Sequence, residues 1–378
     1  MNIKLVFLRN PFFKWAIRMG FTDLMLDFYW GRNDRGQWER VENTGYMARP
    51  KSIWFEPTMR CNLNCIFCHQ NERRKYKIRE MSLGEINVFL EKARAENINL
   101  IEMIGGEIFV RNDIFDILDL VEDKGMRIKL GTNGILLDDN SIAKLMKYRC
   151  IESIAVSVDG PPHVHNTLRN SPVAFEKATG LLKKLGHNPN FATVMYSVLL
   201  PENLESVPFL VTLARELKVD RLTFMPEMFY SRKDISATRE YLNLKEEEKL
   251  YVEVREGIDL EEYVKKVLSV LKMIDKSRKK EMVFVPVFPR ISRKYPRSFF
   301  KGEINTEKKL ICRHFYSLTV IENGDVLLCP FIHRKIGNVL EDEIEELWNN
   351  NIIRELRREI LQRNMLPICR RCCALDYL

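Results

Sequence analysis

The alternation of apolar runs with segments of helical period constrains the fold of this chain more than any other feature. Six runs rich in β-branched and apolar side chains predict strands at residues 53–56, 98–104, 126–131, 151–158, 191–199 and 221–225. Repeated strand–helix pairs with right-handed crossovers form a parallel sheet. The ligand site of such a sheet lies at the carboxyl ends of its strands, whether the sheet closes into a barrel or stays open. We therefore expect functional residues directly after the strands.

Start and stop signals mark several of the helices between these strands. Ser82 and Glu85 have the spacing of a capping box. Ser171 precedes Pro172 at an expected first helical position, and Gly125 follows an expected last turn. The predicted strands therefore lead into capped helices.

The pattern changes after the alternating region. Residues 226–305 are rich in helical pattern and connect it to a later segment. There, residues 318–321 and 326–328 flank Asn323-Gly324, the strongest short hairpin signal, which predicts a small second domain. We expect an N-terminal segment at 1–50, the strand–helix domain at 51–230, a helical basic connector at 231–305 and the second domain at 306–378.

The composition is that of an ordinary globular protein. Of 378 residues, 46% are hydrophobic and 30% are charged, which argues against disordered, collagen-like and membrane-spanning classes. The longest uncharged stretch, residues 185–201, has only 17 residues, so no transmembrane helix fits. Arg9, Lys14 and Arg18 interrupt the N-terminal apolar runs. We therefore expect no secretory signal and a cytoplasmic protein.

Two segments concentrate aromatic or basic side chains. The first thirty residues hold eight aromatic residues interleaved with basic ones. Such a segment can lie on a membrane surface or cap a hydrophobic groove, and a helix packed over the domain core is the alternative. Residues 276–309 hold eleven Lys and Arg against three Glu, either as a solvated linker or as a contact for an anionic group. A peripheral membrane contact through the N-terminus is therefore a candidate interaction, and no nucleic acid is expected.

The nine cysteines fall into two groups and one isolated residue. In a protein without an export signal they are expected to be metal ligands or catalytic thiols, because the cytosol keeps thiols reduced. The isolated Cys150 stands between a predicted helix and a predicted strand. We expect it to be a buried structural thiol.

The first cysteine group follows the first predicted strand. Cys61, Cys65 and Cys68 have the spacing C-x3-C-x2-C. Three thiolates on one short loop can hold three corners of a cubane iron–sulfur cluster and leave the fourth iron without a protein ligand. A structural zinc site needs a fourth ligand, and His69 is poorly placed to reach back. The spacing therefore predicts a cluster with one open iron.

At these residues the chain resembles the radical S-adenosylmethionine (SAM) superfamily. The resemblance implies a [4Fe–4S] cluster whose free iron binds the amino and carboxylate groups of SAM, and a 5′-deoxyadenosyl radical formed by reductive cleavage. It implies a partial (βα)6 TIM-like barrel with a small C-terminal α+β domain for an auxiliary cluster. Phe67, just before the third cysteine, corresponds to a family residue that packs near adenine.

Further motifs of the family follow the next three predicted strands. In Gly105-Gly106-Glu107 the glycines would let backbone groups approach the cofactor and Glu107 would accept a hydrogen bond from its ammonium, although Ile108 replaces the usual proline. By the same resemblance, Ser157 would contact the ribose or carboxylate and Arg169 would pair with the methionyl carboxylate. We expect His163 and His165, in the same loop, to have surface roles. The expected cofactor-binding residues are Phe67, Gly105, Gly106, Glu107, Asn133, Ser157, Asp159 and Arg169.

The second cysteine group resembles the shortened, "twitch" version of the SPASM domain, which holds an auxiliary iron–sulfur cluster. The spacing is C-x11-G-x4-C followed by C-x2-C near the C-terminus. The resemblance implies one auxiliary cluster, with the fourth ligand open between Cys372 and Cys373. A tetrahedral zinc held by four thiolates is the main competitor. The expected ligands are Cys312, Cys329, Cys369 and Cys372.

These features predict an enzyme that abstracts hydrogen from an unactivated C–H bond, with oxidation, bond formation or epimerisation as the outcome. The resemblance implies reduced flavodoxin or ferredoxin as the electron donor. Only about fifty residues precede the barrel, too few for the peptide-recognition domain of many relatives, which favours a small-molecule, sugar or lipid-linked substrate. The alternatives are a peptide maturase and, from another class, a non-catalytic zinc-stabilised nucleic-acid-binding protein. No catalytic residue is assigned.

Overall fold

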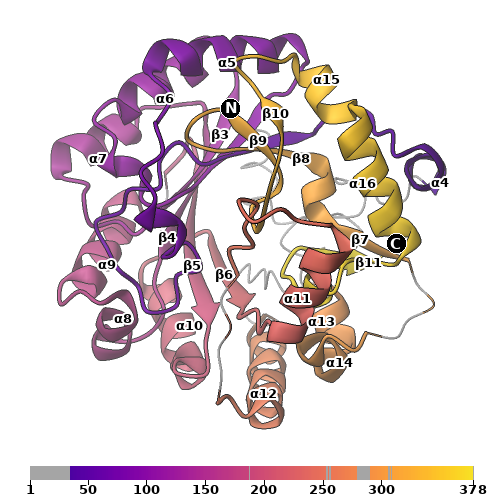
Figure 1. Ribbon diagram of the computed structural model, residues 1–378. Coiled ribbons are helices and arrows are strands. Elements are labelled where there is room, and N and C mark those ends of the chain that lie inside the picture. Colours follow the sequence, from indigo (N-terminus) through magenta and orange to yellow (C-terminus); the bar gives the residue numbers. More distant parts are fainter. Residues whose placement is uncertain are drawn as a thin grey trace.

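One mixed sheet of nine strands, in the order β10-β9-β8-β1-β2-β3-β4-β5-β6, forms the centre of the molecule (Figure 1). The structure is a computed structural model, and it describes residues 35–377 except 187, 253, 255, 256, 279–289, 305, 306 and 308. The expected aromatic segment at residues 1–30 lies outside the described residues, as does part of the basic segment at 276–309.

All six predicted strands of the barrel are confirmed, and each pairs in parallel with the next along the chain. Their boundaries differ from the predicted ones by at most two residues. The strands are β1 (Ser52–Phe55), β2 (Leu100–Met103), β3 (Arg127–Thr132), β4 (Ile151–Ser157), β5 (Ala192–Leu199) and β6 (Arg221–Pro226).

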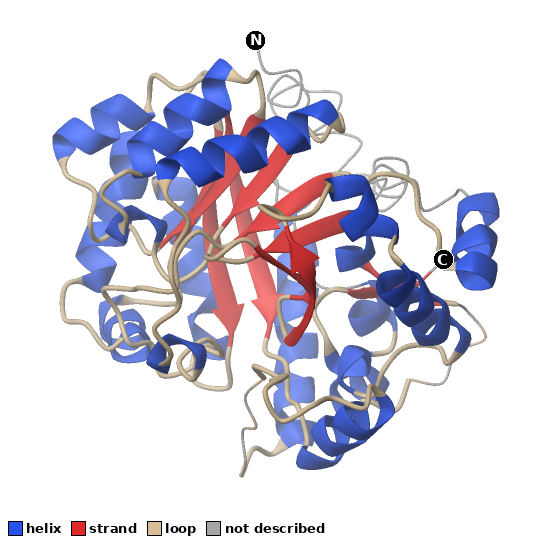
Figure 2. Cartoon of the chain, turned by 45° about the horizontal axis from the view of Figure 1, so that its top comes forward, coloured by secondary structure: helices blue, strands red, loops and turns tan. Residues whose placement is uncertain are grey.

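Helices between these strands lie along the outer side of the curved sheet (Figure 2). They are α5 (Leu83–Ala95), α6 (Ile114–Asp123), α7 (Asp139–Leu145), α8 (Pro162–Arg169), α9 (Ala174–Leu185) and α10 (Val207–Glu216). The capping box of Ser82 and Glu85 at the start of α5 is confirmed. Gly125 follows α6 with a φ of +62°, as a residue after a helix end commonly does.

The helix start predicted at Pro172 is wrong. The Ser171 N–H donates to the Asn166 carbonyl at 3.0 Å and so closes the end of α8. This bond spans five residues and belongs to a helix C-terminus in which Asn170 adopts a left-handed conformation. Because residues 170–172 finish one helix, the next helix begins only at Ala174.

The two faces of the strands differ in chemistry. Side chains that face the helices are apolar and fully buried, such as Phe55 on β1, whose ring meets Phe89 of α5 edge-on. The alternate side chains face the inside of the curved sheet, and many are polar, such as Glu102 and Lys129, which lie opposite each other in register. The core therefore lies between sheet and helices, and the inner face is not an apolar core.

The C-terminal region continues the sheet of the barrel. The hairpin predicted around Asn323-Gly324 is confirmed, since β8 (Ser317–Val320) and β9 (Asp325–Cys329) pair antiparallel. β8 also pairs in parallel with β1, with Ser317 opposite Ser52. The sequence therefore predicted the hairpin but not that it would extend the first sheet.

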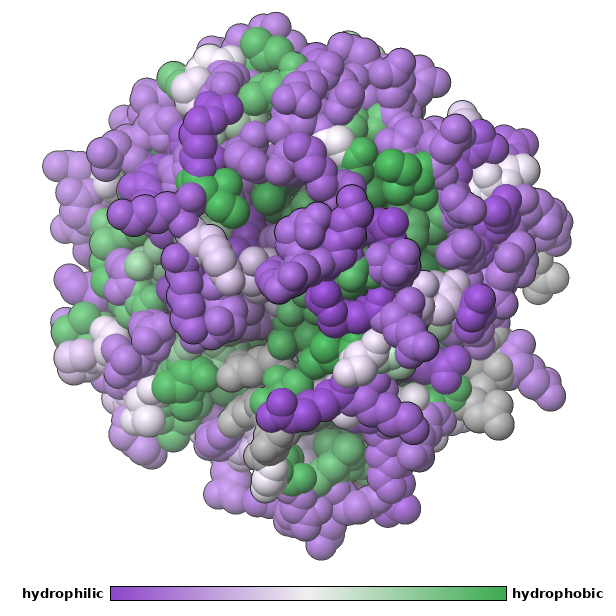
Figure 3. Space-filling model, in the orientation of Figure 1, coloured by the Kyte–Doolittle hydropathy of each residue, from purple (hydrophilic) through white to green (hydrophobic). Residues whose placement is uncertain are grey.

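The remaining elements surround this extension. They are α4 (Arg35–Thr44), α11 (Arg232–Tyr241), α12 (Leu260–Arg278), α13 (Arg290–Lys294), α14 (Pro296–Lys301), β7 (Leu310–Cys312), β10 (Ile332–Asn338), α15 (Ile344–Asn349), α16 (Asn351–Gln362) and β11 (Leu375–Tyr377). β7 and β11 form a separate two-stranded sheet. The face of the molecule seen in Figure 3 is hydrophilic over most of its area, with apolar patches between. Within the described residues, no helix is both long and apolar enough to cross a membrane.

Candidate cofactor and cluster sites

The first cysteine group lies on the loop that follows β1, at the carboxyl end of the sheet. The loop after β2 packs directly against the start of this loop, because the Gly106 N–H donates to the Thr58 carbonyl at 2.9 Å. A Cβ atom on Gly105 would lie 2.5 Å from the Thr58 oxygen, and one on Gly106 would lie 2.2 Å from the Arg60 oxygen. The close approach made by these glycines is therefore to the backbone that leads into Cys61.

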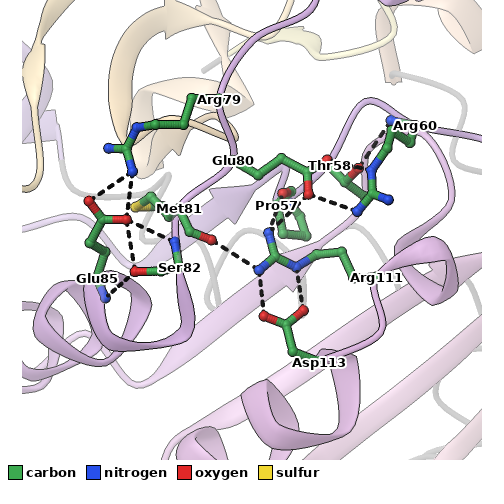
Figure 4. Close-up of polar contacts among 10 residues, drawn as sticks. All are labelled: Pro57, Thr58, Arg60, Arg79, Glu80, Met81, Ser82, Glu85, Arg111 and Asp113. Carbon is green, nitrogen blue, oxygen red and sulfur yellow. Dashed lines mark hydrogen bonds and ion pairs between the residues drawn. The ribbon is translucent and has the colours of Figure 1, made fainter.

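Arg111 anchors the same segment from below the loop (Figure 4). It is 5% exposed and donates to the carbonyl oxygens of Pro57 and Met81, each at 3.0 Å. Its Nε and Nη2 bind the two carboxylate oxygens of Asp113 at 2.9 and 2.7 Å, and this pairing lowers the pKa of Asp113. No sequence pattern pointed to Arg111, because its carbonyl partners come from two separate loops.

Glu80 completes this anchor (Figure 4). Its carboxylate accepts hydrogen bonds from Arg60 Nε and Nη2, both at 2.9 Å, and from the Thr58 hydroxyl at 2.5 Å. Burial alone would raise the pKa of Glu80, but these donors lower it overall. Hydrogen bonds with the loop after β2, with Arg111 and with Glu80 therefore fix the residues just before the first cysteine.

The three thiols differ in exposure. Cys65 is buried, whereas Cys61 and Cys68 are half-buried. Burial raises the pKa of both the Cys61 and the Cys65 thiols, so their thiolates need positive charge nearby. A cluster of iron ions supplies such charge, so this donor set is chemically suited to an iron–sulfur cluster.

Arg169, at the end of α8, joins the end of β4 to the cysteine loop. Its Nε donates to Asp159 Oδ2 at 2.6 Å, and its Nη1 lies 3.9 Å from Cys65 Sγ. The guanidinium carbon lies 5.1 Å from the centre of the Phe67 ring. Burial opposes ionisation of Asp159, but Arg169 and His165 lower its pKa to about 2. The folded chain therefore places a fixed positive charge beside the buried thiol.

Glu107 is held by the chain's own donors. It is 2% exposed, and its two oxygens accept from the Thr132 hydroxyl at 2.8 Å, the Asn133 N–H at 2.7 Å and the Phe109 N–H at 3.2 Å. Burial raises its pKa in spite of these bonds. The Asn133 side chain in turn donates to Asn62 of the cysteine loop at 2.8 Å. The loops after β2 and β3 are thus both tied to the cysteine loop.

The prediction for the two histidines is half wrong. His163 is exposed, as expected, but His165 is 1% exposed and accepts a hydrogen bond from the Asp159 N–H at 3.0 Å. Both lie on α8 and not in a loop, because Pro162 starts a helix directly after β4. Ser157 ends β4 half-buried on the inner face of the sheet.

The second cysteine group converges on one hollow, although its members are far apart in sequence. Four thiols line a space of about 360 Å³, open solvent included, together with Tyr230 and His314; they are Cys312, Cys329, Cys369 and Cys372. Burial raises the pKa of the first three thiols. A hydrogen bond from Cys373 lowers the pKa of Cys372. Four thiols around one space suit an auxiliary iron–sulfur cluster.

This hollow distinguishes the two candidates for the fourth ligand. Cys372 forms part of its wall, whereas Cys373 is not among the lining residues. Among the residues that the structure describes, no three His, Cys, Asp or Glu side chains are arranged to hold a single metal ion. The isolated Cys150 is 5% exposed and packs in the core, as predicted.

A buried ion cluster links the two cysteine regions. Arg73, 1% exposed, pairs with Glu56 after β1 and with Glu322 in the β8–β9 turn. The ring of His69, next to Cys68, lies tilted against that of Phe331, with the ring centres 5.2 Å apart, and Phe331 lines the four-thiol hollow. No sequence motif pointed to Arg73, because its two carboxylates come from opposite ends of the chain.

Two family models match the chain. The Radical SAM superfamily model matches residues 55–214, and the SPASM model, an iron–sulfur cluster-binding domain, matches residues 312–373. The chain is 30% identical to an AdoMet-dependent heme synthase of Methanosarcina barkeri over 44% of its own length and 48% of the relative. It is 22% identical to the subtilosin biosynthesis protein AlbA of Bacillus subtilis, over 81% of the chain and 61% of the relative.

Solved structures share the fold. SuiB of Streptococcus suis, bound to its precursor peptide SuiA, superposes with a TM-score of 0.65 at 18% identity and covers 96% of this chain and 83% of its own. The enzyme anSMEcpe with bound AdoMet and a peptide gives 0.59 at 17% identity and covers 85% of each chain.

The two matched segments together cover more than half of the chain, and each contains one of the two cysteine groups. The chain spans about half the length of the heme synthase and of the Fe-coproporphyrin III synthase that it matches. Members of the superfamily are enzymes; the first domain implies a [4Fe–4S] cluster and SAM, and the second implies an auxiliary iron–sulfur cluster. The chain therefore belongs to the radical SAM superfamily and carries a C-terminal SPASM domain.

Proposed function

We propose that this chain cleaves SAM reductively and removes a hydrogen atom from an unactivated C–H bond of a substrate bound inside the curved sheet. The observation that carries this proposal is the three-thiol loop, held at the carboxyl ends of the strands with Arg169 beside Cys65. Cys61, Cys65 and Cys68 would hold a [4Fe–4S] cluster, which when reduced would supply one electron for cleavage of the C5′–S bond of SAM to methionine and a 5′-deoxyadenosyl radical.

The residues of the chain have distinct parts in this proposal. Cys61, Cys65 and Cys68 hold the cluster, and Asp159 orients Arg169 toward the methionyl carboxylate. Glu107 accepts a hydrogen bond from the methionyl ammonium, and Phe67 packs near adenine. Gly105 and Gly106 bring the loop after β2 onto the cysteine loop. Asn133 and Ser157 complete the SAM site at the ends of β3 and β4.

A small-molecule substrate, including a sugar or a lipid-linked one, is the class that we favour. The heme synthase and Fe-coproporphyrin III synthase relatives act by name on small molecules. Reduced flavodoxin or ferredoxin would supply the electron. The alternative of a zinc-stabilised nucleic-acid-binding protein receives no support from the family matches.

Peptide modification is the second candidate function. The match to AlbA, a bacteriocin biosynthesis protein, extends over 81% of the chain, a larger share than the match to the heme synthase. The deciding experiment uses deuterium-labelled porphyrin, nucleotide and peptide candidates with the anaerobically reconstituted protein. Deuterium in 5′-deoxyadenosine from one class identifies that class as the substrate.

A variant of the first cysteine group tests the cluster assignment. We expect Cys61→Ala, Cys65→Ala and Cys68→Ala together to abolish 5′-deoxyadenosine formation under dithionite, because no thiolate remains to hold the cluster. Cys150→Ala is the matched control, since this thiol is buried in the core away from both groups, and it should keep the activity. Retained cleavage of SAM in the triple variant would contradict the assignment.

A further inference from the structure

The inner face of the barrel sheet is polar and accessible. Residues paired in parallel register point to the same side, so the pairings from β1 to β6 define this face. Most of its side chains on the middle strands are half-buried, whereas those on the opposite face are buried. The half-buried residues of the inner face are Trp54, Glu102, Arg127, Lys129, Gly131, Ala155, Ser157, Tyr196, Val198, Arg221 and Met225. In a closed TIM barrel this space is filled by bulky apolar side chains.

Several charges on this face neutralise one another. Glu102 lies 3.6 Å from Lys129, and Glu152 lies 2.8 Å from Arg127. The Glu102 carboxylate also accepts a hydrogen bond from Ser52 at 3.1 Å. The acidic groups of the inner face thus already have basic partners within the chain.

Arg221, the first residue of β6, differs from these paired residues. It shares the face of Val194 on β5, and its buried Nε has no hydrogen-bond partner among the described residues. The nearby carboxylates act on it only through space; they belong to Glu152, Glu102 and Asp220. Asp220 itself accepts from the Thr193 N–H at 2.9 Å. Burial lowers the pKa of Arg221, as expected for a guanidinium that has lost water without gaining a partner.

A hydroxyl on the same face of β6 and a guanidinium outside β6 also have polar atoms without partners among the described residues. Thr223, two residues along β6 on the same face, is 2% exposed, and its hydroxyl has no hydrogen-bond partner among the described residues. Arg313 donates to the Cys373 carbonyl at 2.5 Å, while its buried Nε lacks a described partner. Tyr196 lies opposite Thr223, and the charges of Arg313 and Arg221 oppose the rise in its pKa that burial causes.

We propose that Arg221, together with the Thr223 hydroxyl, binds the carboxylate or phosphate group of the substrate, an inference that rests on the function proposed above. Buried donors without partners cost stability, and a ligand anion would satisfy them. Guanidinium groups match the geometry of carboxylate and phosphate oxygens, which two or more hydrogen bonds can engage at once. The same donors would therefore accept either anion.

The position of Arg221 also limits the size of the substrate. Arg221 begins β6 and Pro226 ends it, whereas the cysteine loop follows the carboxyl ends of the strands. A rise of about 3.3 Å per residue separates the two ends of β6 by roughly 16 Å. A substrate anchored at Arg221 therefore presents its reacting C–H bond roughly 16 Å or less from its anion.

Calorimetric titration of the reconstituted protein with bound SAM tests this site, with inorganic phosphate and glutarate as probes. We expect at least one probe to bind, and Arg221→Gln to weaken that binding about tenfold or more, as the loss of a charged hydrogen-bonding partner implies. Arg127→Gln is the matched control, because Arg127 lies on the same face but already pairs with Glu152, and its binding should stay within about twofold of the wild type. Binding of phosphate alone or glutarate alone names the substrate anion.

Two results would overturn the inference. One is that neither probe binds to the wild-type protein, and the other is that Arg221→Gln binds as the wild type does. Thr223→Val keeps the shape of the side chain and should also weaken binding. It serves as the test variant if Arg221→Gln loses its iron. SAM cleavage by the wild-type protein is measured in parallel: its absence refutes the proposed function, whereas cleavage without anion binding refutes this inference alone.

Discussion

Two glycines decide how closely the cysteine loop can approach the sheet. At Gly106, a Cβ atom would lie 2.2 Å from the Arg60 oxygen, well inside van der Waals contact. The Gly106 N–H also donates to Thr58. The backbone here cannot retreat without breaking that bond, so the absence of a side chain fixes the position of the residues before Cys61.

A single methyl group tests this constraint. We expect Gly106→Ala to displace the cysteine loop and to lower iron content and 5′-deoxyadenosine formation at least about tenfold, because backbone atoms cannot move aside as a flexible side chain can. Gly84→Ala is the control, since a Cβ on this helical glycine has no atom within 4 Å, and it should leave both quantities unchanged. Normal iron content in Gly106→Ala would show that the loop tolerates the displacement.

At the scale of helices and strands, one buried group of ion pairs links elements that are far apart in the sequence. Arg73 lies in the short helix η1 (Arg73–Lys75), after the cysteine loop, and it joins the end of β1 to the β8–β9 turn through Glu56 and Glu322. All three side chains are at most 2% exposed. The pairing therefore adds a buried ionic link between the first strand of the barrel and the SPASM hairpin to the backbone pairing of β1 with β8.

Removal of this link should be costly. Arg73→Met removes the only positive charge that an ion pair gives to these two buried carboxylates, among the described residues, and leaves Glu56 with the Trp54 Nε1 donor at 3.1 Å. We expect the free energy of unfolding to fall by roughly 3–5 kcal/mol. Urea denaturation of the anaerobic protein measures this change. Lys75→Ala, in the same short helix but with its side chain exposed, should change the free energy by less than about 0.5 kcal/mol. A loss of less than about 1 kcal/mol in Arg73→Met would mean that water or a neighbouring donor replaces the guanidinium.

At the scale of the whole molecule, the nine-stranded sheet leads to the first cysteine group at the end of β1 and to Cys329 at the end of β9. β8 pairs with β1, so the hairpin that ends at Cys329 is in hydrogen-bonded register with the strand that leads to Cys61. The four-thiol hollow is closed by Cys369 and Cys372, which come from the short helix η5 (Ile368–Arg371) and the residue after it. Because no cysteine of the first group lines this hollow, we expect that the second group can lose its metal while the first remains intact.

Iron analysis of single variants checks this independence and the choice of ligand. We expect Cys369→Ala to lose about four of about eight irons per chain, to keep SAM cleavage and to lose substrate turnover. Cys373→Ala should keep all the iron, because this thiol does not line the hollow. Loss of iron from Cys373→Ala but not from Cys372→Ala would reverse the ligand assignment.

The sequence determined the features that depend on local spacing. The six strands, the capping box at Ser82 and the hairpin at Asn323-Gly324 all follow from short-range patterns, because periodicity and turn chemistry act over a few residues. The helix start predicted at Pro172 is wrong because the Ser171 N–H already closes the end of the preceding helix. The Ser-Pro pattern alone does not contain that information.

Only the tertiary structure decided which distant groups meet. The Arg73 link, the Arg111 anchor and the unpaired Arg221 inside the sheet each depend on residues from separate strands or loops. A pattern of spacing contains no information on which charge will find a partner after folding. That outcome depends on strand pairing and burial, because the same arginine is a solvated surface group in one position and a buried, unsatisfied donor in another.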